Sequence, residues 1–177
     1  NYLYFQFNCY KFTALCQYTK MMKSLILMGY MGCGKSALGI QIARQTSLPF
    51  IDLDQYIESE EKKTISSIFN EQGEIYFRKK ERLYMQQLLL TKSNHVISLG
   101  GGTPCYFDNI DFLNRQEESF TVFLKTSPKE LTQRLYAQKD LRPVIAHLES
   151  EEKLEEYIAK HLFERMPFYQ KANKTIT

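Results

Sequence analysis

Short apolar runs along the chain alternate with longer stretches in which apolar residues recur at helical spacing. Each run predicts a buried strand, because a strand covered on both faces of a parallel sheet reads as continuously hydrophobic. The predicted strands are 25–28, 48–54, 95–99 and 120–124, and residues 175–177 could begin a fifth. The predicted helices are 37–45, 55–61, 64–69, 74–90 and 108–115, followed by one after Ser127 and one after Ser150.

Local signals predict where several helices begin and end. Ser127-Pro128 supplies an N-cap followed by a proline at the first helical position. Gly73 is expected to separate the helix before it from the long helix after it. Ser150 is expected to cap the last helix, and 165–167 to end it at a proline. The aperiodic stretch 138–143 predicts an exposed loop.

Residues 1–20 differ from the rest of the chain. They hold seven aromatic residues and only two charges, both lysine, and they show neither a helical nor a two-residue period. The segment lacks the basic start, apolar core and small-residue cleavage site of a signal peptide. We therefore expect a non-native or disordered extension over 1–20 and one folded domain over 21–177.

Composition bounds the class of protein. The chain has 177 residues, of which 44% are hydrophobic and 24% charged, as is typical of one globular domain. A formal net charge of +3 suits an anionic small substrate and does not by itself argue for nucleic acid. No apolar run reaches the length that a membrane span needs. The four cysteines lack metal-ligand spacing, which predicts free thiols in a reducing cytosol: Cys9, Cys16, Cys33 and Cys105.

A glycine-rich stretch carries the strongest chemical signal. Gly29-Tyr30-Met31-Gly32-Cys33-Gly34-Lys35-Ser36 fits the phosphate-loop pattern Gly-x-x-x-x-Gly-Lys-Ser/Thr, between a predicted strand and a predicted helix. The glycines let the backbone turn tightly and point N–H groups at an anion. Lys35 would reach the β- and γ-phosphates of a nucleotide, and the Ser36 hydroxyl would hold Mg²⁺. The alternative is a tight glycine turn that binds nothing, and the flanking elements argue against it.

Two carboxylates end the second predicted strand. Asp52 and Asp54 share one face if the strand persists through both. One could then lie near Mg²⁺ while the other accepts a proton from an attacking hydroxyl. Asp54 could instead merely cap the helix that begins at Gln55. The residues alone leave both interpretations open.

Three further places also carry alternatives. Arg78 lies four positions after Glu74 and three before Glu81, which is the spacing of a surface ion pair on a helix. Glycines 100–102 form either a flexible turn or, at the carboxyl end of a strand, part of a ligand site. Arg142 is by default a solvated loop charge. The three histidines have no partner pattern, and a core or surface place is expected for each: His95, His147 and His161.

From Met22 onward the chain resembles the shikimate kinase family, small P-loop kinases of the nucleoside-monophosphate-kinase type. The matching pieces occur in the family's order and approximate spacing, and they are 29–36, 50–54, 77–78, 100–102, 141–143 and 165–169. The resemblance implies an α/β fold of three layers, with a five-stranded parallel sheet between helices and a mobile lid around Arg142. It further implies a monomeric, cytoplasmic enzyme that transfers the γ-phosphoryl group of ATP to the 3-hydroxyl of shikimate, with Mg²⁺, in aromatic amino-acid synthesis.

The resemblance also implies roles for individual residues. It assigns ATP binding to Gly32, Cys33, Gly34, Lys35, Ser36, Ala37 and Arg142. It assigns shikimate binding to Asp54, Arg78, Gly100, Gly101, Gly102 and Arg165, with the two arginines on the carboxylate. Ser36 would hold the metal and Asp52 would support it through water. Lys35, Asp54 and Arg142 would form the catalytic set. Arg134 is a further candidate near the nucleotide.

The chain departs from the family pattern in two places. Leu99 stands before the glycines where the family commonly has threonine. Thr177 falls short of a final strand and helix that usually follow and that commonly supply part of the adenine pocket. The second departure bears on nucleotide affinity rather than on the type of reaction.

Two other functions fit part of the pattern. One is a kinase of another small polyol acid such as gluconate. The other is a non-catalytic relative that binds a nucleotide or a partner protein. A binding module would have no need of Lys35, Asp54, Arg142 and Arg165 together, which argues against the second.

Overall fold

The computed structural model describes residues 9–21, 24–90, 94–139 and 143–177. Its centre is a five-stranded, all-parallel sheet with the strand order β2-β3-β1-β4-β5. The strands are β1 (Ser24–Met28), β2 (Phe50–Asp52), β3 (His95–Ser98), β4 (Ser119–Leu124) and β5 (Lys174–Ile176). All five predicted strands are confirmed. The second is shorter than expected, because Leu53 already belongs to the next helix.

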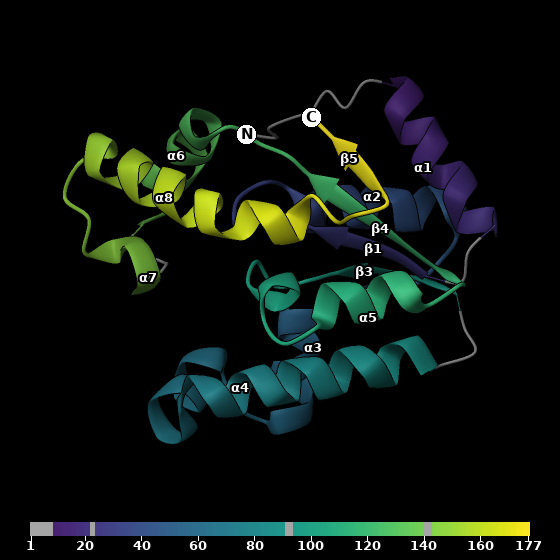
Figure 1. Ribbon diagram of the computed structural model, residues 1–177, viewed down its shortest axis with the longest axis horizontal. Coiled ribbons are helices and arrows are strands. Elements are labelled where there is room, and N and C mark those ends of the chain that lie inside the picture. The colour runs from purple at the N-terminus through teal and green to yellow at the C-terminus, as the bar shows by residue number, and fades with distance from the viewer. Residues whose placement is uncertain (1–8, 22–23, 91–93, 140–142) are drawn as a thin grey trace.

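Helices lie on both faces of the sheet. They are α1 (Cys9–Met21), α2 (Lys35–Thr46), α3 (Leu53–Glu61), α4 (Ile65–Leu90), the 3₁₀ turn η1 (Thr103–Cys105), α5 (Asn109–Arg115), α6 (Pro128–Tyr136), α7 (Pro143–Ala146) and α8 (Glu151–Tyr169). In Figure 1, α5 and α8 lie in front of the sheet and α2 lies behind it. Right-handed crossovers require this arrangement, because the connection from β1 to β2 runs in one direction across the sheet and the later connections run in the opposite direction. The fold is therefore the expected three-layer α/β/α architecture.

The strands beside the phosphate loop form the centre of the core. Every residue of β1 and of β3 is buried. β1 runs between β3 and β4, with Leu25 opposite Val96 on one side and Phe120 on the other. A strand in this position has no solvent-facing side, which explains its continuous apolar sequence.

Of two predicted helix boundaries, one occurs as a kink and the other does not occur. α4 contains the predicted break as a kink, since Gly73 has φ 79° and ψ 171° inside it. The predicted end of the last helix at 165–167 is wrong, because α8 includes Pro167 and continues to Tyr169. Tyr169 is fully buried, stacks on Phe123 at 4.9 Å and donates to the Gly101 carbonyl at 2.6 Å. These contacts hold the last turn in place although proline removes a helical hydrogen bond.

The amino-terminal segment also departs from expectation. Residues 9–21 form helix α1, which lies beside α2 at one end of the molecule (Figure 1). Leu15 is only 1% exposed, and the Tyr18 ring stacks on Phe120 of β4 with centroids 4.1 Å apart. The expectation that this segment does not pack is therefore corrected for these residues. Tertiary contacts bury this helix, and its sequence has no repeating apolar pattern from which that burial could be predicted.

Three smaller findings complete the fold. β5 pairs with β4 from Val122–Lys174 to Leu124–Ile176, so the expected start of a fifth strand is a paired strand. Within the described ranges, no helix combines the length and apolar character needed to cross a membrane. Within the described part of the chain, Cys33 and Cys105 are free thiols.

Candidate active site

The phosphate loop joins β1 to α2 through three glycines with positive φ. Gly29, Gly32 and Gly34 have φ angles of 145°, 78° and 100°. A Cβ on Gly29 would lie 2.8 Å from the Leu124 carbonyl oxygen, so a side chain has no room there. Gly34 precedes α2, and no side chain caps the helix. The first N–H groups of α2 can therefore bind an anion, assisted by the positive end of the helix dipole.

Lys35 lies folded against the loop that carries it. Its Nζ donates to the carbonyl oxygens of Gly29 at 2.9 Å and Tyr30 at 3.0 Å, and it lies 3.7 Å from the Cys33 sulfur. The residue is only 8% exposed. The ammonium group is thus hydrogen-bonded to backbone carbonyls of the phosphate loop, and Lys35 lines the cavity that a phosphate would occupy.

Ser36 and Asp52 meet at the carboxyl edge of the sheet. The Ser36 hydroxyl donates to Asp52 Oδ2 at 2.9 Å. The other carboxylate oxygen accepts from the backbone N–H groups of Asp54 at 3.2 Å and Gln55 at 3.4 Å. Asp52 is therefore the N-cap of α3, and the reading of Asp54 as the cap is wrong. The strand also ends before Asp54, so the expected sharing of one strand face does not occur.

Asp54 occupies a crowded position in the first turn of α3. A Cβ on Gly100 would lie 2.7 Å from Asp54 Oδ1 and 3.0 Å from Glu81 Oε1. Burial raises the pKa of Asp54 to about 6, with further upward contributions from the charges of Glu81 and Asp52. The cations Lys35 and Arg78 oppose that rise. A carboxyl with this pKa is ionised at neutral pH and is a stronger base than an ordinary aspartate, which suits it to accept a proton as a hydroxyl reacts.

Arg78 is held by two carboxylates and an aromatic ring. Its Nη1 donates to Glu81 Oε2 at 2.9 Å, while Nε and Nη2 lie 3.3 Å from Glu74 Oε1. The guanidinium lies 4.0 Å from the centroid of the Tyr106 ring. A Cβ on Gly102 would lie 2.9 Å from Arg78 Nη1, so the glycine permits the close approach. Arg78 is 12% exposed, and a simple surface ion pair does not describe it.

Glu81 also lies in the site, although its sequence position indicated only a possible ion pair with Arg78 on a helix. It is 1% exposed, and its Oε1 accepts from the Thr103 hydroxyl at 2.6 Å. A buried carboxylate is stable only with such partners. The sequence contained one usable signal, namely a charged residue on the face of α4 that also carries the buried residues Phe77, Tyr84 and Met85.

Arg165 comes from α8, and its guanidinium lies beside Gly101. Its Nη1 would lie 3.6 Å from a Cβ on Gly101, and its Nη2 lies 3.4 Å from Nε2 of His161. The guanidinium lies 5.6 Å from the centroid of the Tyr30 ring. His161 also contacts the Tyr30 hydroxyl through Nδ1 at 3.1 Å. His161 is half-buried, and these two polar partners could not be predicted from the sequence.

Two adjoining cavities are lined by most of these residues, and Arg165 lies beside Gly101, which lines both. A cavity of about 430 Å³ is lined by Met31, Gly32, Gly34, Lys35, Ser36, Ala37, Asp52, Asp54, Ser98, Leu99, Gly100, Gly101 and Gln138. A neighbouring one of about 170 Å³ is lined by Asp54, Ile65, Phe69, Phe77, Arg78, Glu81 and glycines 100–102. Asp54, Gly100 and Gly101 line both. The larger cavity contains the phosphate loop, the smaller one contains Arg78 and Glu81, and the Asp54 carboxylate lies where they meet.

The remaining candidates have different outcomes. Arg142 lies outside the described residues. Arg134 Nη1 reaches the carbonyl oxygens of Gly32 and Cys33, each at 3.4 Å, which places a further cation at the phosphate loop. Cys33 is buried at 1% exposure, so it can contribute backbone rather than side-chain contacts.

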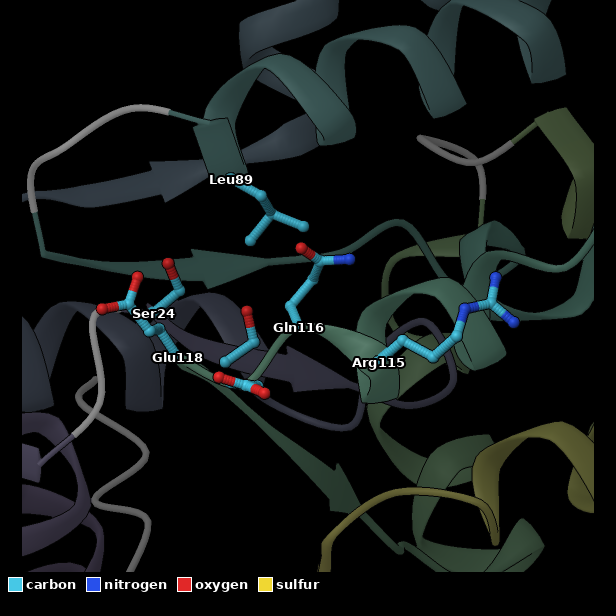
Figure 2. A pocket seen from close by; sticks show the side chains of 7 residues that line it. Ser24, Leu89, Arg115, Gln116 and Glu118 are labelled. Carbon is cyan, nitrogen blue, oxygen red and sulfur yellow. The ribbon is translucent and has the colours of Figure 1, made fainter.

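A third hollow, of about 320 Å³, lies at the other end of the strands. Its lining is Ser24, Leu89, Arg115, Gln116, Glu117, Glu118 and Ser119. Ser24 and Ser119 begin β1 and β4, so this hollow is at the amino edge of the sheet. In Figure 2 the Arg115 side chain points away from Ser24 and Glu118, and it pairs with Asp108 at 2.8 Å. Ligands of open parallel sheets bind at the carboxyl edge, so the first two cavities form the candidate active site.

A parallel sheet of this order, a phosphate loop after its first strand and an acceptor cavity at its carboxyl edge define a P-loop kinase. The family model described as shikimate kinase matches residues 31–177. The shikimate kinases of Flavobacterium johnsoniae and Flavobacterium psychrophilum are 44% and 41% identical over 155 residues, which is 88% of this chain and 89% of each relative. The chain belongs to the shikimate kinase family.

Solved structures agree with this assignment. The crystal structure of shikimate kinase from Bacteroides thetaiotaomicron matches with a TM-score of 0.81 and 41% identity, over 88% of this chain and 86% of that one. The structure of shikimate kinase from Acinetobacter baumannii in complex with shikimate matches with a TM-score of 0.77 and 30% identity, over 92% and 87%. Both the family and the fold expected from the sequence are thereby confirmed.

Proposed function

We propose that this chain transfers the γ-phosphoryl group of ATP to the 3-hydroxyl of shikimate, with shikimate 3-phosphate and ADP as products. The observation that carries the proposal is the position of Asp54, a carboxyl with a pKa of about 6 that lines both the phosphate-loop cavity and the arginine-lined cavity. Donor and acceptor would meet at this carboxylate. Membership of the shikimate kinase family and a relative solved with shikimate support the choice of acceptor.

The acceptor carboxylate would be bound by two arginines. Arg78 and Arg165 come from helices α4 and α8, and their guanidinium groups lie beside Gly102 and Gly101 respectively. A guanidinium is always charged and presents parallel N–H groups that match a carboxylate. Glycines 100–102 would let the shikimate ring lie against bare backbone. With the carboxylate held at one end, the 3-hydroxyl would be directed to Asp54 at the other.

The transfer step assigns a separate task to each catalytic residue. Asp54 would accept the proton of the 3-hydroxyl while the hydroxyl oxygen forms a bond to the γ-phosphorus and the bond to the β-phosphate oxygen breaks. Lys35 would leave the carbonyls of Gly29 and Tyr30 and neutralise charge on the phosphates, because a phosphate is a stronger acceptor for an ammonium group. Arg134 would support the nucleotide near Gly32. The role of Arg142 over the transferring phosphate rests on the family resemblance alone.

Ser36 and Asp52 are suited to a magnesium ion. A hydroxyl and a carboxylate oxygen lie 2.9 Å apart beside the phosphate loop, and both are hard oxygen donors of the kind Mg²⁺ prefers. Among the described residues, no three or more His, Cys, Asp or Glu side chains are arranged to hold a metal ion, which fits a metal bound mainly by substrate phosphates and water. When bound, the ion would neutralise charge on the β- and γ-phosphates. Ser36 would contact it directly and Asp52 through water.

The wider setting stays a prediction. The reaction would serve aromatic amino-acid synthesis, and the protein would act as a monomer in the cytoplasm. These statements follow from the family resemblance, and the free thiols Cys33 and Cys105 support the cytoplasmic location.

A coupled assay of ADP release tests the proposed function. The purified chain with ATP and Mg²⁺ should release ADP rapidly with shikimate and only at a background rate with gluconate or with water alone. Phosphorus NMR of the product should identify a monoester at the 3-hydroxyl. ADP release that is fastest with gluconate, or equal with all three, would overturn the proposal.

A further inference from the structure

His161 stands between the phosphate loop and the carboxylate-binding arginine. On one side its Nδ1 lies 3.1 Å from the hydroxyl of Tyr30, a residue of the phosphate loop. On the other its Nε2 lies 3.4 Å from Nη2 of Arg165, one helical turn further along α8. Tyr30 is 1% exposed, so the phenol is fixed, and its backbone carbonyl accepts from Lys35 at 3.0 Å.

The partners of His161 determine where its proton lies. A guanidinium can only donate hydrogen bonds, so Nε2 must be the unprotonated, accepting nitrogen. The ring proton then lies on Nδ1 and is donated to the Tyr30 hydroxyl oxygen. His161 is therefore neutral in this arrangement. A second proton on Nε2 would replace the hydrogen bond to Arg165 by a contact between two donors and two positive charges.

The charges around the ring favour this neutral form. Burial lowers the pKa of His161 below its ordinary value of 6.5, and the charge of Arg165 lowers it further, while Glu164 acts in the opposite direction. The other groups that face the ring are the Tyr30 phenol and the Tyr157 ring, whose centroid is 5.0 Å away. Helix α6, packed against α8, turns Arg134 toward the loop carbonyls of Gly32 and Cys33.

One end of the Arg165 guanidinium thus contacts His161, and the other end faces Gly101. Nη2 lies against His161, whereas Nη1 lies beside Gly101, which lines both cavities. The Tyr169 hydroxyl donates to the Gly101 carbonyl at 2.6 Å and borders the same guanidinium. An arginine fixed in this way loses less side-chain entropy when it binds a carboxylate.

We propose that neutral His161 is a positioning residue that orients Arg165 for the acceptor carboxylate and anchors it to the phosphate loop through Tyr30. This inference rests on the proposed function, since it names what holds one of the two arginines of that site. It assigns His161 to acceptor affinity and not to the phosphoryl-transfer step. Protonation of His161 would release Arg165, so acceptor affinity should fall in acid.

The test compares three variants by calorimetric titration with shikimate and by steady-state kinetics. His161→Leu removes both ring nitrogens and should raise the dissociation constant and KM for shikimate about 3- to 10-fold, the range that one hydrogen bond supplies, with kcat within about twofold. His161→Gln places an amide oxygen near the position of Nε2 and should restore binding to within about twofold of the parent. His147→Leu is the matched control, because His147 contacts Tyr157 and neither Arg165 nor Tyr30 in the described contacts, and it should bind shikimate as the parent does.

A pH series separates positioning from a merely structural role. Between pH 7.5 and 4.5 the parent should lose shikimate affinity relative to His161→Gln, which cannot titrate at this position, and the loss should appear below pH 6.5 because the pKa of His161 is lowered. Because both proteins retain Asp54, its own titration cancels in the ratio. Normal binding by a folded His161→Leu, or a parent-to-Gln ratio that is flat with pH, would overturn the inference. The proposed function fails separately, if the parent itself shows no shikimate-dependent ADP release.

Discussion

Arg78 donates from Nη1 to Glu81 Oε2 across 2.9 Å, and the accepting carboxylate is only 1% exposed. The second oxygen of Glu81 accepts from Thr103, so the carboxylate is fully engaged and fixed in direction. The same negative charge raises the pKa of Asp54. One buried residue therefore acts on both the acceptor-binding arginine and the proton acceptor.

Replacing Glu81 by glutamine should alter both properties. Glu81→Gln keeps the size of the side chain but removes its charge, so Arg78 is held less firmly and KM for shikimate should rise by about 3- to 10-fold. Asp54 loses one of the charges that raise its pKa, and the acid limb of the kcat profile should move to lower pH. Glu74→Gln is the control, because Glu74 is half-exposed and should have the smaller effect. An acid limb that does not move would contradict the coupling.

Asp54 should be both essential for turnover and unfavourable for stability. Its folded-state pKa of about 6 lies above the ordinary value of 3.8, so the folded protein favours the protonated carboxyl. Folding therefore loses stability as pH rises from 3.8 through 6, and the full penalty applies above that window. Asp54→Asn cannot ionise, and at pH 7.5 it should be more stable by about 1–3 kcal/mol.

The measurements for Asp54→Asn are thermal unfolding at pH 7.5 and 4.5 together with turnover. The gain in melting temperature should shrink at pH 4.5, where the parent carboxyl is protonated in the folded state. Turnover should fall by about two to four powers of ten, as is usual when a proton acceptor is lost. For the parent, kcat should decline as pH falls through 6. A variant that is less stable at pH 7.5 would show that the buried charge is better compensated than we infer.

Lys35→Ala tests the phosphate loop. The change removes the ammonium group that lies on the Gly29 and Tyr30 carbonyls and that would move to the phosphates. Turnover should fall by about two or more powers of ten, the scale of one oriented electrostatic contact, while circular dichroism stays that of the parent. Lys129→Ala, on the first turn of α6, is a control that removes one positive charge elsewhere. Normal turnover by folded Lys35→Ala would remove the basis for the nucleotide assignment.

The two acceptor arginines should tolerate lysine poorly. Arg78→Lys and Arg165→Lys keep the charge but lose the planar pair of donors, so shikimate binding should weaken by about 10- to 100-fold, nearly as much as with alanine. ATP binding should barely change. If Arg78 formed only a surface ion pair, either substitution would leave KM unaltered. A shikimate analogue without the carboxylate should bind the parent as poorly as shikimate binds these variants.

Helix α1 should contribute measurably to stability. A chain that begins at Met22 loses the buried Leu15 and the Tyr18 ring that stacks on Phe120. Leu15→Ala in the full chain should cost about 2–5 kcal/mol, the range for leucine in a packed core, and truncation should cost at least as much. Gln17→Ala, at an exposed position of the same helix, should be neutral. Equal melting temperatures for the full and truncated chains would show that α1 does not contribute to stability.

The sequence by itself determined the features that depend on neighbouring residues. The phosphate loop was readable because its glycines and Lys35 act within one turn of backbone. Buried strands such as 25–28 were readable because a strand covered on both faces has to be apolar throughout. The N-cap at Ser127 was readable because the capping box closes within three residues, as the bond from the Glu130 N–H to the Ser127 hydroxyl confirms.

The tertiary structure decided which polar side chains meet. Asp52, not Asp54, caps α3, because the strand ends at Asp52 and the helix already begins at Leu53. Leu53 is fully buried. The apolar neighbours of Glu81 on its helix face hint at burial, but only the tertiary structure shows that Thr103 and Arg78 are its partners. Likewise, His161 contacts the hydroxyl of Tyr30, a partner 131 positions earlier in the chain that no local spacing predicts. Spacing encodes local backbone geometry, whereas burial and partners at long range arise only when the helices pack on the sheet, and those partners decide the charge and direction of each group in the site.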